Sequence, residues 1–126
     1  IMAATSHSVL TPLANIELAD SAVTNTSVDN ASGSSGTLTL YYVEVDNSAN
    51  SSTTYLKMVR ASSATPSSTG PDTILSAPAA TISYFAFATG MDQTYLTYWA
   101  TSTAANGTSQ TAPSTAVTAR FLCKHA

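Results

Sequence analysis

The chain has 126 residues, of which 9% are charged, and its formal net charge at pH 7 is −3. The four basic residues stand singly, whereas binding to a nucleic-acid backbone needs clustered Lys and Arg. No apolar run has the length of a membrane-spanning helix. These observations argue against a nucleic-acid partner and against a membrane partner.

Ser and Thr make up nearly a third of the chain. A surface of this kind has little charge repulsion to keep neighbours apart, and it loses little side-chain entropy when it is covered. It suits a protein that packs against other chains. Compositional drift in a secreted or environmental protein explains it equally well. The length favours one domain with one core.

The N-terminal stretch has no clear hydrophobic period. Residues 1–20 are expected to be an arm or a first strand, ahead of a sandwich domain over residues 21–126 that ends in a C-terminal strand or tail. Residues 15–20 are expected to form one helical turn at most. Residues 21–29 alternate loosely around Val23 and Val28, which predicts a weak strand.

The strongest strand signal is TLTLYYVEVD over residues 37–46. Its apolar residues occupy both faces: Leu38, Leu40 and Tyr42 on one, Tyr41, Val43 and Val45 on the other. This pattern predicts a central strand that is covered on both sides or that has one face at an interface. A polar loop over residues 47–53 leads to TYLKMVR over residues 54–60, and we expect the two strands to form an antiparallel hairpin.

Further strands are predicted over residues 72–76, 80–88, 93–103 and 115–124, with a turn at Gly90 and another at Asn106-Gly107. About seven or eight strands without an amphipathic helix indicate an all-β fold. We expect an antiparallel β-sandwich, Ig-like or jelly-roll-like, with a small barrel as the alternative. Few charged residues lie on these strands to prevent pairing at the sheet edges, so we expect neighbouring subunits to cover the edges.

The sequence gives little sign of catalysis or of a bound cofactor. His7 and His125 stand at opposite ends of the chain, and terminal segments are poor platforms for a general base. Glu44 and Asp46 share a strand face, which allows a calcium site, although a polar strand end followed by a turn is the preferred interpretation. Cys123 is expected to be a small buried apolar residue. We therefore predict a protein that is not an enzyme and holds no cofactor and no metal.

Aromatic residues lie on predicted strands and not at loop tips. Core and interface packing is the preferred account of them. A carbohydrate-binding groove is the alternative, and it would depend on Trp99 or Tyr98.

Two segments resemble small virion proteins of tailed phages. They read GTLTLYYVEVDNSANSSTTYLKMV (residues 36–59) and GPDTILSAPAATISYFAFATG (residues 70–90), and with the loop that joins them the resemblance covers about half of the chain. The positions that carry the resemblance are Asp46, Asn47, Tyr55, Leu56, Lys57, Pro71, Asp72, Leu75, Pro78, Ala79 and Gly90. They mark a β-sandwich and not an active site.

The resemblance implies a capsid decoration (cement) protein on the outer capsid surface. Such proteins commonly form homo-oligomers, often trimers, and clamp adjacent subunits of the major capsid protein. A tail, neck or fibre component remains an alternative. The apolar character of the two ends of the chain suggests where the contacts lie, and the expected interface residues are Val9, Leu10, Leu13, Arg120, Phe121 and Leu122.

Overall fold

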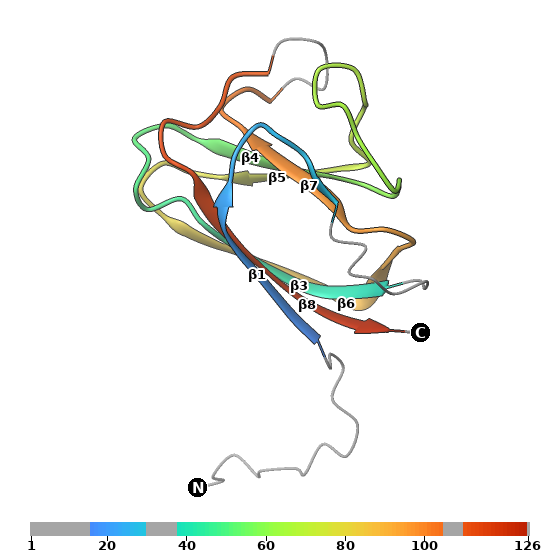
Figure 1. Cartoon of the computed structure of the whole chain (residues 1–126). Helices are drawn as coiled ribbons and strands as arrows, with labels where there is room; N and C mark the ends of the chain where they lie inside the picture. Colours follow the sequence, from blue (N-terminus) through green and yellow to red (C-terminus); the bar gives the residue numbers. More distant parts are fainter. Residues whose placement is uncertain (1–15, 30–37, 105–109, 126) are drawn as a thin grey trace, which may run out of the picture.

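The computed structural model describes residues 16–29, 38–104 and 110–125, and in these ranges it contains strands and no helix (Figure 1). Sheet A consists of β1 (Ile16–Val23), β3 (Leu38–Asp46), β6 (Ile82–Gln93) and β8 (Val117–His125). Sheet B consists of β2 (Val28–Asp29), β4 (Thr54–Val59), β5 (Thr73–Ala77) and β7 (Thr97–Thr101). No helix that could cross a membrane is found in the part of the chain described.

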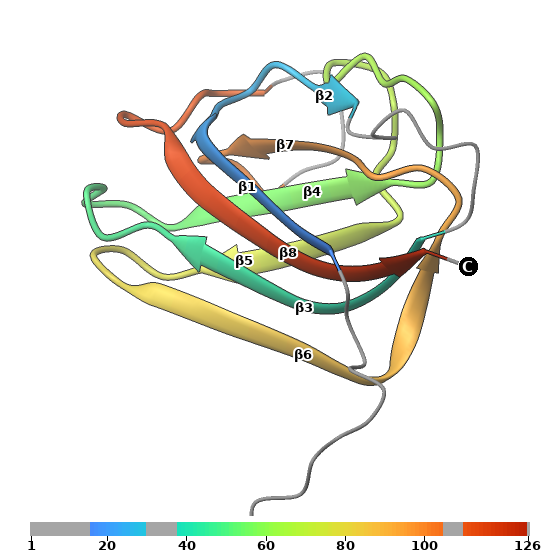
Figure 2. The same ribbon diagram turned by 60° about the horizontal axis from the view of Figure 1, so that its bottom comes forward.

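The two sheets pack face to face, which confirms the predicted antiparallel β-sandwich (Figures 1 and 2). The strand order is β1-β8-β3-β6 in sheet A and β2-β7-β4-β5 in sheet B, and all pairs are antiparallel. The chain resembles one long hairpin wound around the sandwich, because β1 pairs with β8, β2 with β7, β3 with β6 and β4 with β5. This order is a jelly roll and not the Ig-like alternative.

The first strand begins at Ile16, within the stretch expected to be an arm or a first strand. Residues 15–20 were expected to form one helical turn at most; residues 16–20 form no helix and pair with residues 119–123 of β8. The expected boundary after residue 20 therefore falls inside β1. Residues 1–15 of the expected arm lie outside the described residues.

Inward-facing side chains of both sheets fill the space between the layers. The members of this core with no exposed surface include Val23, Leu40, Val43, Val45, Leu56, Met58, Ala77, Ala100, Ala119, Phe121 and Cys123. Tyr98 of sheet B stacks on Phe121 of sheet A with their ring centroids 4.8 Å apart. Cys123 is buried, as predicted.

A β-bulge in β3 explains why both faces of this strand looked apolar. The register against β8 runs from Leu40↔Cys123 directly to Tyr42↔Leu122, so Tyr41 is an extra residue. The bulge reverses the alternation, and Leu40 and Val43 both point into the core. Tyr42 was expected to share a face with Leu40, and that expectation is wrong.

The predicted hairpin between residues 37–46 and 54–60 is also wrong. Its two strands exist, but β3 belongs to sheet A and β4 to sheet B, so the loop between them crosses the sandwich. The buried side chain of Asn47 holds this corner: its Nδ2 donates to the carbonyl oxygens of Ser52 and Ala77, both at 3.0 Å.

The expected turn at Gly90 lies inside β6, which continues to Gln93. The register against β3 shifts here from Tyr42↔Ala86 to Leu40↔Met91, so residues 87–90 of β6 bulge out opposite the single residue Tyr41 of β3. Gly90 has a φ of +81°, and a Cβ at this position would lie 2.4 Å from Cγ2 of Thr39. Glycine is therefore required by the bulge and does not end the strand.

The outer faces of the two sheets differ. On sheet B, the neighbouring residues Lys57 and Trp99 are completely buried although both point away from the core. Lys57 Nζ donates to Oε1 of Gln110, in the segment after β7, at 2.8 Å. Thr97, on the same face, donates to the carbonyl of Ala61. On the outer face of sheet A no segment of the described residues gives such cover, and Ile82 and Tyr84 are exposed there. We call this the open face.

Candidate functional site: the open face of sheet A

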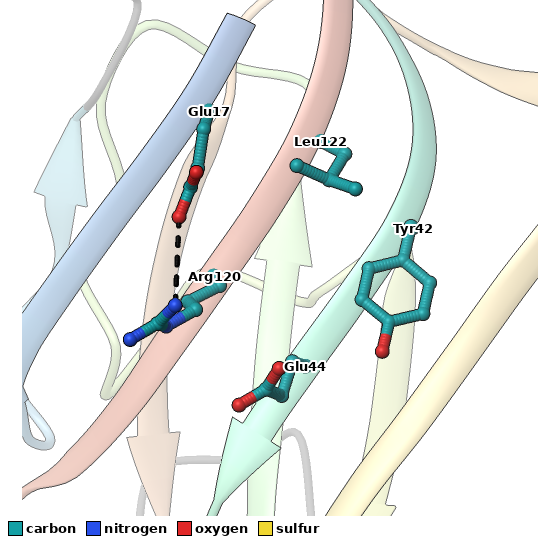
Figure 3. A pocket seen from close by; sticks show the side chains of 5 residues that line it. All are labelled: Glu17, Tyr42, Glu44, Arg120 and Leu122. Atoms are coloured by element: carbon teal, nitrogen blue, oxygen red, sulfur yellow. Dashed lines mark ion pairs between the residues drawn. The ribbon is translucent and has the colours of Figure 1, made fainter. Parts of the chain in front are cut away.

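A shallow hollow of about 220 Å³ lies on the open face of sheet A (Figure 3). Three neighbouring strands supply its lining, which consists of Glu17 from β1, Tyr42 and Glu44 from β3, and Arg120 and Leu122 from β8.

Strand register places these side chains together. Leu122 lies opposite Glu17 on one side and Tyr42 on the other, while Arg120 lies opposite Glu44. Residues directly opposite in antiparallel strands have Cβ atoms about 5 Å apart, so their side chains share one patch. The period of two along β3 and β8 gives each strand two residues in the hollow.

Carboxylates outnumber cations on this face. Glu17 Oε1 lies 3.6 Å from Nη1 of Arg120, and both side chains are about half exposed, so this ion pair contributes little to stability. Glu44 and Asp46 add two more carboxylates on the same strand face. Hydrogen bonds from the hydroxyl and the backbone N–H of Ser48 lower the pKa of Asp46, with a smaller contribution from Arg120. The face therefore carries net negative charge around one guanidinium.

Aromatic and aliphatic side chains extend the hollow toward β6. The rings of Tyr42 and Tyr84 are tilted, with their centroids 6.1 Å apart, and Tyr84 is 59% exposed. Ile82 is 42% exposed. The pKa of the Tyr42 hydroxyl is raised by burial and, to a smaller extent, by Glu44 and Tyr84. Exposed tyrosines beside charged groups are typical of protein interfaces, and they also suit other flat ligands.

Of the expected interface residues, Arg120 and Leu122 line this hollow. Phe121 lies between them and points inward, where it has no exposed surface, so it cannot contact a partner in this fold. Successive side chains along β8 point to opposite faces of the sheet, so Arg120 and Leu122 point outward while Phe121 points inward. Val9, Leu10 and Leu13 lie outside the described residues.

Sequence reasoning missed Glu17, Tyr42, Glu44 and Tyr84 as a group. Glu17 fell in a stretch that was expected to be an arm or a first strand and that has no clear period, and the bulge placed Tyr42 on the face opposite to the one expected. Trp99 and Tyr98, on which the alternative of a carbohydrate-binding groove would depend, are both buried, in agreement with the preferred interpretation of core packing.

The arrangement offers no constellation for metal binding within residues 16–29, 38–104 and 110–125, where no group of three metal-ligating side chains is found. Asp46 accepts two hydrogen bonds from Ser48 and forms the expected turn at the strand end. Burial raises the pKa of the Cys123 thiol to about 11, which keeps it protonated near neutral pH. His7 and the side chain of His125 lie outside the described part. The open face is suited to binding.

No protein-family model, no curated protein and no solved structure matches this chain.

Proposed function

We propose that this protein is a non-enzymatic structural protein that binds other protein subunits through the open face of sheet A. One observation carries the proposal. The chain covers the outer face of sheet B with its own segments, down to the complete burial of Lys57 and Trp99, yet leaves Tyr42, Tyr84 and Arg120 uncovered on sheet A. Tyr and Arg are the residues that most often anchor a protein–protein contact.

The charge of the hollow indicates the kind of partner surface that fits it. Glu17, Glu44 and Asp46 surround the single guanidinium of Arg120, so a basic segment of a partner gains favourable electrostatics here. Because all of these groups are partly exposed, salt will weaken the attraction. We expect affinity to fall as the ionic strength is raised.

We propose further that the partner is a major capsid protein and that the protein decorates the outer surface of a virion as a homo-oligomer. The resemblance of residues 36–59 and 70–90 to small phage virion proteins supports this assignment. Jelly rolls occur among viral capsid domains and also among lectins, so the fold agrees with the proposal without deciding it. An oligomer would engage several capsid sites at once, which turns weak single contacts into firm attachment.

The proposal is tested by adding the purified protein to phage heads that have been stripped of it and by counting the bound copies. Glu44→Lys should lower the affinity about tenfold or more, because it replaces attraction with repulsion. Asp92→Lys is the matched control, since it changes the net charge equally at an exposed position beyond the Gly90 bulge. Equal loss in both variants would refute the role of the hollow, and a copy number far below that of the shell protein would favour a tail, neck or fibre position.

The pair of Tyr42 and Tyr84 beside two carboxylates favours one alternative, a carbohydrate-binding module, because sugars stack on exposed aromatic rings and donate hydrogen bonds to acidic groups. This alternative predicts binding on a glycan array that Tyr84→Ala abolishes. Capsid attachment predicts no such binding.

A further inference from the structure

The four sheet edges formed by the described residues differ in how they are protected. In sheet B, β2 has two residues and β5 has five. In sheet A, β1 carries Glu17 and Asp20. The remaining edge, β6, has 12 residues, no proline and no charged residue before Asp92. Proteins usually guard long edge strands with charge, proline or a bulge, because an unguarded edge pairs with another strand.

The unguarded part of β6 is the run ISYFAFA over residues 82–88, in which more exposed and less exposed side chains alternate as far as Ala88. Residues 82–86 of this run pair with β3 on one side, and Phe87 and Ala88 belong to the bulge. No described strand lies on the other side of β6 (Figure 2). Its outer face presents Ile82 and Tyr84, both largely exposed, while Phe85 and Phe87 are only half-buried at the rim of the core. Within the part of the chain that the structure describes, apolar side chains and backbone groups without a strand partner thus occur together on one edge.

We propose that this edge pairs with β6 of a second copy of the chain, antiparallel and about a two-fold axis at Phe85. The two A sheets would then join into one continuous sheet. Phe85 is the midpoint of residues 82–88, so an axis there uses the whole alternating run.

The side chains of the run complement themselves about this axis. Ile82 comes opposite Ala88 of the second copy, and Tyr84 comes opposite Ala86, so each large exposed residue meets a small one. Paired residues are an even number of positions apart, which keeps exposed side chains on one face and inward side chains on the other. A different sheet edge would match this size pattern only by coincidence.

Charge also favours a second copy over a different partner. Any charged residue close to a two-fold axis lies near its own copy, and like charges directly opposite each other destabilise a strand pair. Residues 82–91 contain none. The pair is closed, because each copy uses the same edge, and the other edge of sheet A carries the acidic residues of β1. The contact therefore produces dimers and not filaments. It uses the backbone edge of β6, whereas the hollow is lined by residues of β1, β3 and β8, so it does not rest on the proposed function; Tyr84 borders both surfaces.

Sedimentation velocity over a wide range of protein concentrations tests the proposal. The wild-type protein should sediment as a monomer–dimer mixture. Tyr84→Lys/Ala86→Lys puts lysine opposite lysine in two symmetric pairs, which should raise the dissociation constant about tenfold or more. Tyr84→Lys/Ala86→Glu puts lysine opposite glutamate and should restore dimerisation. Both positions are exposed, so the fold should survive, and circular dichroism checks this.

Two controls separate the edge from other surfaces. Ala19→Lys/Ser21→Lys adds the same charge to exposed positions of the opposite edge strand and should leave the dimer intact. Glu44→Lys should also leave the dimer intact while weakening partner binding. A failure of the dimer proposal can therefore be told apart from a failure of the proposed function. A strictly monomeric wild type, a trimer, a dimer that persists in the double-lysine variant, or a lysine–glutamate variant that stays monomeric would each overturn the proposal.

Discussion

Nδ2 of Asn50 donates a hydrogen bond to Oδ1 of Asn47 at 2.9 Å, and both side chains are buried at the corner where the chain leaves β3 for β4. Oδ1 of Asn47 also accepts from Oγ1 of Thr54 at 2.8 Å. Asn50 in turn donates to the carbonyl oxygen of Thr115 and accepts from its backbone N–H. Two asparagine side chains thus join the start of β4, the β5–β6 turn and the approach to β8.

Asn47→Ala should lower the free energy of unfolding by about 3 kcal/mol or more, because it leaves several buried partners without their hydrogen bonds. Urea denaturation followed by tyrosine and tryptophan fluorescence measures the change. Ser51→Ala, at an exposed position of the same loop, is the control and should stay within about 0.5 kcal/mol of the wild type. Similar stabilities for the two variants would contradict this account of the corner.

Gly90→Ala should destabilise the protein by about 1–3 kcal/mol, since the added Cβ meets Thr39 and the backbone has a positive φ. Gly70→Ala is a matched control: it has no atom within 4 Å of the new Cβ, and Gly70 is not among the positive-φ residues. It should be neutral or slightly stabilising. Thermal denaturation of both variants would reveal the difference, and an unchanged Gly90→Ala protein would argue against the bulge.

Tyr98→Phe should cost about 1–2 kcal/mol. The Tyr98 hydroxyl donates to Oδ2 of Asp20 at 2.8 Å and so ties sheet B to β1 of sheet A, and hydrogen bonds to charged groups are the stronger kind. Tyr95→Phe removes a hydroxyl from a residue that is 36% exposed, and little change is expected. The comparison is made by urea denaturation at neutral pH.

The buried thiol of Cys123 predicts a loss of stability in alkali. Its pKa in the folded protein is raised to about 11 from an ordinary value of 9.0, so the unfolded chain releases this proton first. The stabilisation is complete below pH 9 and is lost as the pH rises toward 11, by an amount of about 2–3 kcal/mol. Unfolding free energies at pH 8 to 11 should therefore fall more steeply for the wild type than for Cys123→Ala. Parallel curves would contradict the prediction.

Gln93→Met should stabilise the protein by about 1 kcal/mol. The Gln93 side chain is completely buried, and among the described residues neither of its amide atoms has a hydrogen-bond partner. Methionine has a similar shape and no amide to desolvate. Gln93→Glu is the opposing test, because it places a charge there and should destabilise strongly. Both are measured by thermal denaturation.

The strands themselves were predictable because alternation and turn residues are local signals. Residues 54–60, for example, were expected as a strand and form β4 over residues 54–59. Their pairing was not predictable. Whether the chain turns back beside β3 or crosses to the other sheet is decided by contacts of Asn47 with residues 77 and 78, about 30 positions away. A loop of Asn and Ser fits both outcomes.

The binding face was predictable only where alternation was uninterrupted. Along β8, the outward positions of Arg120 and Leu122 follow from the inward series that ends in Cys123. Along β3, the extra residue Tyr41 shifts the phase, and no local feature of TLTLYYVEVD marks which residue bulges. Tyr42 and Glu44 could therefore not be joined to Arg120 before the register was known.

Pairing between β1 and β8 has a mechanical consequence. Ile16, where β1 begins, lies opposite Cys123, close to the end of β8, so the first and last strands meet at the same end of their ladder. A force that pulls the two chain ends apart acts across the ladder and not along it. It breaks the hydrogen-bonded pairs one after another, as a zipper opens, instead of loading all of them together. A cargo or tether fused to the two ends would thus peel β1 away at low force.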